Sequence, residues 1–316
     1  MVSLTKVAIV LVIVIVSLFL YFSDSVDKTG LEATVENKVI LITNRDVVQE
    51  AFEFVFSEYP NTKGPNELSS FTVTGSPSNP TVSSIDEHLD RHLAGMGSEK
   101  LNALFYIHGF NTSAREAISD ALSMSRLYSR DVLLFSWSAP EYNWIELISH
   151  RDAIRDARAS RGALGRLLSK LKENRTPKVE WDLMAFSLGN SFLVESVLVE
   201  PKNLRQFRSV ISVAAAVNSP SAQGWFSELA KQTSTHILYN KNDYALYLQK
   251  IVMSEPRMGA QPFFRTCFDN VNYTEVTEIQ SVGLSHSYHV NQKSGTEVKN
   301  LILSILKDNP PPNGCD

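Results

Sequence analysis

The chain has 316 residues, of which 43% are hydrophobic and 20% are charged, and its formal net charge is -4 at pH 7. This composition is typical of a chain with a buried core, and it excludes a disordered chain or a collagen-like repeat. The charge balance offers no general attraction to nucleic acid or anionic lipid. Cys267 and Cys315 form no C-x-x-C pair, which excludes a cysteine-based zinc or redox site and leaves their pairing with each other open.

An apolar run at the N-terminus predicts a transmembrane helix. Residues 7–22 read VAIVLVIVIVSLFLYF, and a helix counted from Leu4 is roughly 28 Å long, close to the ~30 Å hydrocarbon core of a bilayer. The run is longer than the apolar part of a typical cleaved signal peptide, so residues 1–22 are predicted to be a signal anchor, with cleavage as the alternative. Lys6 precedes the run and acidic residues follow it, which predicts a single-pass protein with its main domain extracytoplasmic, or periplasmic in a Gram-negative cell.

A polar linker at 23–36 is followed by one predicted domain at 37–308 and a disordered, proline-rich tail at 309–316. The predicted strands are Lys38–Thr43, Ser70–Thr74, Ala103–His108, Val132–Trp137, Glu180–Phe186, Ser209–Val217, Thr235–Asn240 and Glu275–Val282. The predicted helices are Ser113–Ser129, Ile145–Lys172, Gly189–Val199, Ser221–Lys231, Tyr244–Val252 and Lys293–Lys307. Residues 57–69 and 75–100 are expected to be loops, with one helix at Ser84–Leu93. This alternation predicts an α/β fold with a mostly parallel central sheet flanked by helices.

The segment DLMAFSLGN, which starts at Asp182, carries the candidate nucleophile, Ser187. An apolar strand runs into this serine and Gly189 opens a helix, which is the arrangement of a nucleophile elbow. The sharp turn needs small residues two places before and after the serine, and Ala185 and Gly189 stand there. The common pattern has glycine at the first place, and the alternative is an ordinary serine at a helix N-terminus.

A buried strand that ends in His108-Gly109 predicts an oxyanion loop. Gly109 lets the backbone bend toward the site, so that the amide of Phe110 is one donor and the amide of Leu188 is the second. We interpret His108 as a residue that shapes this loop rather than as the general base. Trp137, just past another strand, is the candidate wall of the site.

The candidate acid and base follow Ser187 along the chain. Asp243 ends a polar turn after a strand, which suits the acid of a Ser-Asp-His order; Asp269 is the alternative, and helix capping is the ordinary role of such an aspartate. The base must come from a loop that reaches back over the serine. The run GLSHSYH offers His286 and His289, and His286 is preferred because it lies in the flexible Gly-Leu-Ser-His part.

Six short motifs occur in one order along the chain. They are ILITNR at 40–45, YIHGFN at 106–111, FSWS at 135–138, AFSLGN at 185–190, NDYAL at 242–246 and SHSY at 285–288. This ordered set resembles a bacterial α/β-hydrolase family long known only as a domain of unknown function, whose members are esterase- and lipase-like in their motifs. The resemblance spans about residues 38–305 and implies the α/β-hydrolase fold, with Ser187 as nucleophile, Asp243 as acid and His286 as base. Phe186, Ser138 and Ser285 depart from the histidine, proline and glycine of many members, which leaves specificity open.

These patterns predict a membrane-anchored serine hydrolase that cleaves carboxylic esters through an acyl-enzyme. An amidase, thioesterase or acyltransferase would use the same triad, and a catalytically silent binding module of the same fold is the alternative from another class. The sequence has no metal or nucleotide motif, so neither a cofactor nor a metal is expected. The expected partners are a small-molecule or lipid ester and the membrane. The arginines at 151–166 alternate with acidic residues, which indicates a solvated helix face rather than a nucleic-acid site.

Overall fold

The computed structural model describes residues 37–50, 53–60, 64, 66–85, 89–94, 96, 103–139, 150–174, 179–197, 200–262, 270–291 and 295–308. The predicted transmembrane helix at 1–22, the linker at 23–36 and the tail at 309–316 lie outside these residues, as do Asp269, Cys267 and Cys315. Within the described ranges, no helix combines the length and the apolar character that crossing a membrane requires.

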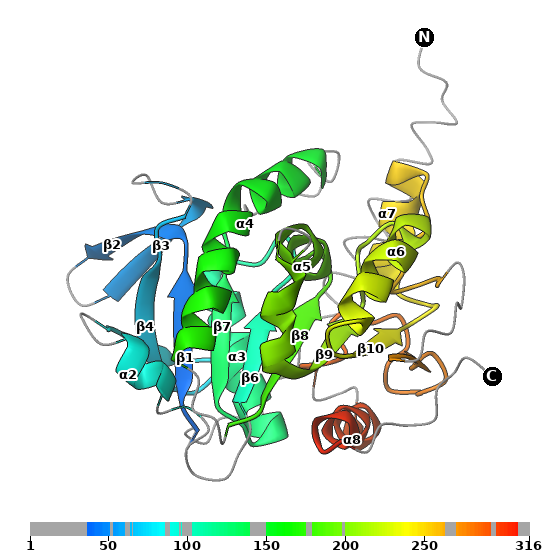
Figure 1. Cartoon of the computed structure of the whole chain (residues 1–316). Helices are drawn as coiled ribbons and strands as arrows, with labels where there is room; N and C mark the ends of the chain where they lie inside the picture. Colours follow the sequence, from blue (N-terminus) through cyan, green and yellow to red (C-terminus); the bar gives the residue numbers. More distant parts are fainter. Residues whose placement is uncertain are drawn as a thin grey trace.

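A nine-stranded sheet forms the centre of the domain, in the order β11-β10-β9-β8-β6-β7-β1-β4-β5 (Figure 1). Strands β11 to β1 of this order run parallel, whereas β4 and β5 continue the edge beyond β1 in antiparallel pairs. The mostly parallel sheet predicted from the sequence is therefore confirmed. The strands are β1 (Val39–Thr43), β4 (Ser69–Gly75), β5 (Pro80–Ser84), β6 (Ala103–Ile107), β7 (Val132–Ser136), β8 (Trp181–Phe186), β9 (Phe207–Val213), β10 (Ser234–Tyr239) and β11 (Val271–Glu275).

Helices cover both faces of this sheet, because a parallel neighbour is reached only by a crossover. Helices α3 (Ala114–Tyr128) and α8 (Gly295–Leu306) contact each other on one face (Figure 1). Helices α4 (His150–Glu173) and α5 (Gly189–Val197) contact each other on the opposite face, beside α6 (Ser219–Ala230). The remaining helical elements are α2 (Leu89–Ala94), the 3-10 helix η3 (Pro201–Gln206) and α7 (Tyr244–Met253).

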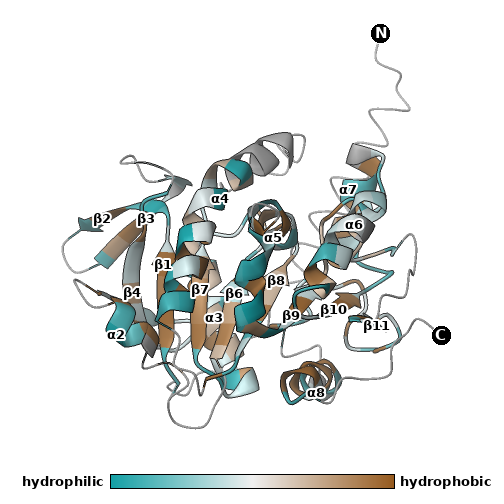
Figure 2. Cartoon of the chain, viewed as in Figure 1, coloured by the Kyte–Doolittle hydropathy of each residue, from teal (hydrophilic) through white to brown (hydrophobic). Residues whose placement is uncertain are grey.

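The central strands form the core of the domain. Every residue of β1, β6, β7 and β8 is buried. Strands buried on both faces need apolar residues throughout rather than in alternation, which is why these segments are continuous apolar runs in the sequence. Figure 2 shows these strands in brown, with more mixed colours on the helices around them.

The last predicted strand is wrong. Strand β11 ends at Glu275, and the predicted strand Glu275–Val282 is instead a series of turns. The amide of Ile279 donates to the carbonyl of Val276, and the amide of Val282 donates to the carbonyl of Ile279. Val276, Ile279 and Val282 thus recur every third position, which is the spacing of hydrogen bonds in tight turns. Their apolar side chains serve the packing of these turns and do not indicate a strand.

The stretches predicted as loops also contain strands. Strand β3 (Glu53–Pro60) pairs with β2 (Arg45–Glu50) in a separate antiparallel hairpin, and β5 lies within residues 75–100. None of the residues of β5 is buried, so this edge strand needs no apolar run that the sequence would show. The single helix predicted in this region, Ser84–Leu93, is observed as the shorter α2.

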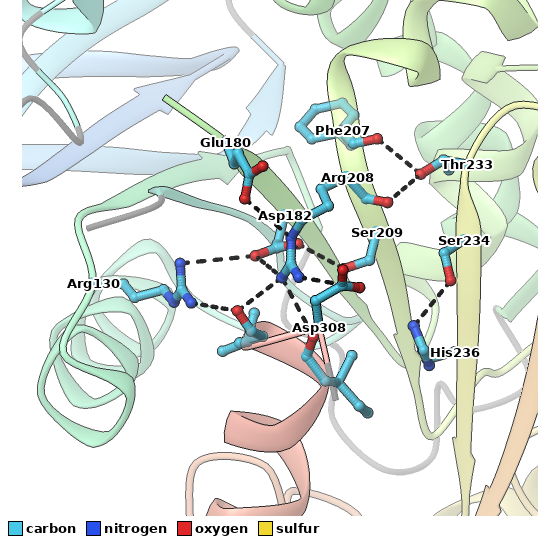
Figure 3. A network of polar contacts seen from close by, with 12 residues as sticks. Arg130, Glu180, Asp182, Phe207, Arg208, Ser209, Thr233, Ser234, His236 and Asp308 are labelled. Carbon is cyan, nitrogen blue, oxygen red and sulfur yellow. Dashed lines mark hydrogen bonds and ion pairs between the residues drawn. The ribbon is translucent and has the colours of Figure 1, made fainter. Parts of the chain in front are cut away.

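A buried polar network at the start of β8 joins α8 to the sheet (Figure 3). Arg208 Nη2 donates to both carboxylate oxygens of Asp182 at 2.8 Å, and Ser209 Oγ donates to Oδ1 at 2.7 Å. Arg130 and Arg208 both donate to the carbonyl of Leu306, at 2.6 and 2.8 Å. Two guanidinium groups thus satisfy a carbonyl at the end of α8, where positive charge is favourable.

Candidate active site

Ser187 lies at the sharp turn between β8 and α5. Its φ is 50°, in the left-handed region that is strained for a residue other than glycine. Its amide donates to the carbonyl of Val213 at 3.0 Å. The side-chain amide of Asn190, which the sequence analysis did not single out, donates to the carbonyls of Ala185 and Ser187 at 2.9 and 3.1 Å. These hydrogen bonds hold the turn in its strained conformation.

Glycine is required at the start of α5 because the loop after β6 passes directly over it. A Cβ atom on Gly189 would lie 2.5 Å from the carbonyl oxygen of His108 and 2.8 Å from that of Ile107. Both neighbours are backbone atoms, which cannot move away as a flexible side chain does. The small-residue requirement predicted from the elbow pattern therefore has a specific steric cause.

Three side chains from separate elements meet at this turn. His286 Nε2 lies 2.8 Å from Ser187 Oγ, and His286 Nδ1 lies 2.6 Å from Asp243 Oδ2. Asp243 is completely buried, and its Oδ1 accepts the amide of Leu246 at 3.0 Å as the N-cap of α7. Helix capping, the alternative role considered for Asp243 from the sequence, is therefore present as well. Oδ1 caps the helix and Oδ2 contacts the histidine.

His289, the alternative base, lies elsewhere. Its ring is buried against the ring of Phe186, with centroids 4.4 Å apart, and its Nε2 lies 3.4 Å from the hydroxyl of Tyr106. Its carbonyl accepts a hydrogen bond from Tyr128. These contacts place His289 in the core, whereas His286 contacts Ser187. Asp269, the alternative acid, is outside the described residues.

The loop after β6 packs directly on the serine. A Cβ atom on Gly109 would meet the Cβ of Ser187 at 3.0 Å and the ring of Phe186 at 3.1 Å. Phe110 follows Gly109 on this loop, and Leu188 follows Ser187 just before the first residue of α5. Backbone amides at the start of a helix have no acceptor within the helix. Both predicted oxyanion donors therefore belong to the two segments that meet at the serine.

His108 and Trp137 support this loop from the core. His108 Nδ1 lies 2.7 Å from the carbonyl oxygen of Gly109, and the ring stacks on Trp137, whose Nε1 donates to the His108 carbonyl at 2.9 Å. Burial, followed by the positive charge of Arg45, lowers the pKa of His108 to about 3, so the ring is neutral near pH 7. Trp137, expected as a wall of the site, is completely buried behind His108 instead.

Two further residues that the sequence analysis did not single out hold the histidine loop. The side-chain amide of Asn240 donates to the carbonyls of Gly283 and Ser285 at 3.0 and 3.1 Å, next to His286. The hydroxyl of Tyr288 donates to a carbonyl of β10 at 3.0 Å. The position of Asn240, directly after a strand and three residues before the candidate acid, was its only signal in the sequence.

The charged groups on α4 pair with neighbouring segments. Arg158 forms an ion pair with Glu195 of α5 at 3.1 Å, and Arg166 with Glu67 at 3.8 Å. These acidic partners come from other elements; the side chains of Asp152 and Asp156, which the sequence suggested as partners within the helix, lie outside what the structure describes. In the part of the chain that the structure describes, no group of three or more His, Cys, Asp or Glu side chains is arranged to hold a metal ion.

The site lies at the carboxyl end of the parallel strands. Strand β6 lies between β7 and β8 in the sheet. The chain continues from β6 to its neighbour β7 on one side, whereas β8 on the other side leads on to β9 and the opposite edge. Such a switch point is where open α/β sheets place their sites. A sharp strand-to-helix turn at a serine after β8, a glycine loop after β6 and a histidine loop beyond β11 are the features of the α/β-hydrolase fold.

The comparisons with known proteins identify the family. The family model described as "Alpha/beta hydrolase of unknown function (DUF900)" matches residues 83–302, and the chain belongs to this family. No curated protein matches the chain.

Several solved structures are similar to the chain at low sequence identity. Lipase B of Aspergillus fumigatus is 13% identical with a TM-score of 0.43, over 74% of this chain and 60% of that chain. An arylesterase is 11% identical with a TM-score of 0.41, over 91% of this chain and 88% of that chain. The carboxylesterase CesB of Bacillus subtilis is 10% identical with a TM-score of 0.36, over 83% of this chain and 90% of that chain.

Proposed function

We propose that this chain is a serine hydrolase that cleaves carboxylic esters, with Ser187 as nucleophile, His286 as general base and Asp243 as the acid. The observation that carries the proposal is the pair of contacts from His286, 2.8 Å to Ser187 Oγ and 2.6 Å to Asp243 Oδ2. Distances of about 2.6–3.2 Å are those at which a base takes the proton of a nucleophile. The backbone strain at Ser187 adds support, because such strain is concentrated at functional sites.

The reaction follows from these contacts. His286 Nε2 takes the proton of Ser187 Oγ as that oxygen bonds to the acyl carbon, and the carbonyl oxygen becomes an oxyanion. Asp243 accepts the Nδ1 proton in a hydrogen bond, which fixes the tautomer of the ring and stabilises the imidazolium. The imidazolium then gives its proton to the leaving alcohol, and an acyl-serine remains. Water attacks this ester with His286 again as base, which releases the acid and restores the serine.

The amides of Phe110 and Leu188 are the proposed donors to the oxyanion. One such donor contributes roughly 10²–10³ in kcat. The N-terminus of α5 adds a favourable dipole, since unpaired amides at a helix start attract negative charge. Support comes from the close packing of Gly109 on Ser187, because Phe110 directly follows Gly109 along the chain.

Membrane anchoring by residues 1–22 is part of the proposal, with the hydrolase domain extracytoplasmic. It rests on the length and composition of the apolar run alone. After a carbonate wash, the full chain is expected to sediment with membranes, whereas a variant lacking residues 1–36 is expected to stay in the supernatant. Sedimentation of neither protein would remove the anchor from the proposal.

Labelling with a fluorophosphonate probe tests the nucleophile, because this probe reacts with a serine that a base and an oxyanion hole activate. The full chain in detergent is expected to be labelled, and Ser187→Ala and His286→Gln are expected not to be. Ser191→Ala is the matched control, since Ser191 lies on α5 one turn further and bonds to the carbonyl of Ala216. Hydrolysis of a p-nitrophenyl ester is expected to fall by on the order of 10⁴ or more in Ser187→Ala.

Two outcomes would change the proposal. A folded wild-type chain that is not labelled would contradict it and favour a binding protein on a hydrolase fold. Faster cleavage of a p-nitroanilide than of the p-nitrophenyl ester with the same acyl group would keep the triad and replace the esterase with an amidase.

A further inference from the structure

A pocket lies beside α7, and neither Ser187 nor His286 of the candidate active site lines it. Its volume is about 300 Å³, and it is lined by the end of β10, one side of α7 and residues 257–262. Three of the lining residues, Lys241, Lys250 and Arg257, are cationic, and none of the described residues that line it is a carboxylate.

Arg257 is the residue that points to a ligand. Only 4% of it is exposed, and among the residues that the structure describes its Nε and Nη2 have no hydrogen-bond partner. The carboxylate of Glu255 lies 3.8 Å from the third nitrogen, Nη1, which is an ion pair beyond hydrogen-bond distance. A buried charged group with unpaired donors is costly, and it is uncommon without a reason. Nε and Nη2 share one edge of the guanidinium, and that edge matches two oxygens of a carboxylate or a phosphate.

The other lining residues fit the same ligand. Lys250 Nζ donates to the neutral side chain of Gln261 at 3.1 Å, so this contact leaves its charge uncompensated. Lys241, in contrast, pairs with Glu275 at 2.7 Å, outside the pocket lining. Tyr247 and neighbouring apolar residues supply surface for an apolar group. The volume lies at the lower end of the range for small-molecule pockets, which is about 300–1,000 Å³.

We propose that this pocket binds a small organic anion, in which a carboxylate or phosphate group contacts Arg257 and Lys250 and an apolar body packs on Tyr247. The pocket and the candidate active site share the first turn of α7: Leu246 lines the pocket and donates its amide to Asp243. The proposal does not depend on the hydrolase chemistry, because neither the serine nor the histidine lines the pocket.

Isothermal titration of the full chain in detergent with phenyl phosphate and with benzoate tests this site. Saturable binding of at least one probe is expected, with one probe molecule per chain. Arg257→Gln is expected to weaken it about tenfold or more, because a charge-assisted pair is lost. Arg257→Lys keeps the charge but not the two-nitrogen edge, so it is expected to weaken binding too. Lys250→Gln is expected to weaken binding about threefold or more.

Lys231→Gln is the matched control, since Lys231 is an exposed lysine at the C-cap of α6 that pairs with Glu228. It is expected to bind the probes as the wild type does, and so is Ser187→Ala, which separates this proposal from the hydrolase assignment. Lys250 is exposed, so its variant remains a test if the variants of the buried Arg257 do not fold. The absence of saturable binding, or equal affinities in Lys250→Gln and Lys231→Gln, would overturn the proposal.

Discussion

At Ser187 the backbone adopts a φ of 50°, which costs a non-glycine residue about 1–3 kcal/mol. The amide hydrogen bond to Val213 and the two side-chain hydrogen bonds of Asn190 hold this conformation. None of these contacts uses the serine hydroxyl. Replacement of Ser187 by alanine is therefore expected to remove the proposed nucleophile and to keep the turn, which makes it the appropriate variant for the labelling experiment.

His108 is a second residue whose environment has a measurable consequence. Its ring is completely buried, stacked on Trp137 and close enough to Arg45 to be affected by that charge. The pKa is lowered from 6.5 to about 3, so the folded protein keeps this ring neutral while the unfolded chain protonates it. Between these two values the unfolded state binds one more proton, and the free energy of unfolding therefore falls as the pH decreases.

The free energy of unfolding is expected to be about 2 kcal/mol lower at pH 5 than at pH 8 through His108 alone. The lowered pKa of His236, about 4, acts in the same direction. In His108→Gln the loss between pH 8 and pH 5 is expected to be smaller than in the wild type by this amount, whatever its stability at pH 8. Denaturant unfolding at the two pH values measures the difference, and an unchanged loss in the variant would contradict the assignment.

At the scale of elements, the site depends on how closely the loop after β6 approaches the start of α5. The backbone of His108 and Ile107 lies against Gly189, and the backbone at Gly109 lies against Ser187. These two contacts bring the loop of Phe110 next to the elbow. At both places the approach is close enough that a Cβ atom on the glycine would force its neighbours to shift.

Gly189→Ala is expected to destabilise the domain by about 1–3 kcal/mol and to reduce fluorophosphonate labelling, because its Cβ would overlap two carbonyl oxygens. Gly165→Ala on α4 is the control, since a Cβ there would meet no atom within 4 Å. Alanine in a helix interior is favoured over glycine by up to about 1 kcal/mol, so this control is expected to be neutral or stabilising. Denaturant unfolding and labelling of both variants test the contact, and equal behaviour of the two would argue against it.

At the scale of the whole molecule, one end of β8 leads into the candidate site and the other end belongs to a buried polar network. Ser187 follows its carboxyl end, whereas Asp182, near its amino end, forms the buried network of Figure 3. That network connects β8 to the arginines Arg130 and Arg208, and through them to the end of α8. The last helix is thus attached to the sheet at the end remote from the site.

Asp182→Asn is expected to lower the free energy of unfolding by about 3–5 kcal/mol, because it leaves two partly buried guanidinium groups without their shared carboxylate. Glu180→Gln is the control: Glu180 is largely exposed and lies 3.8 Å from Arg208, so a loss of less than about 1 kcal/mol is expected. Chemical denaturation measures both. Asp182→Asn protein that remains folded is expected to react normally with the fluorophosphonate, and a small loss of stability would show that the network is not a structural anchor.

The sequence alone predicted the parallel core of this fold, and it also indicated a nucleophile elbow, which stays a prediction. Strands buried on both faces require continuous apolar runs, as at Ala103–Ile107 and Trp181–Phe186, and such runs are visible without knowledge of their neighbours. The elbow is also local, because its small residues stand two positions from Ser187. Edge strand β5 left no comparable pattern, since none of its residues is buried and its pairing with β4 decides its structure.

Other features depended on the tertiary structure. His286 and His289 are three residues apart and chemically alike, and only the packing of the loop directs one toward Ser187 and the other into the core beside Phe186 and Tyr106. The same is true of Arg257, whose Nε and Nη2 lack a partner among the described residues because of how the folded segments pack around them. A sequence pattern records the neighbours of a residue along the chain, whereas hydrogen-bond partners and burial are set by segments that the folded sheet brings together from distant positions.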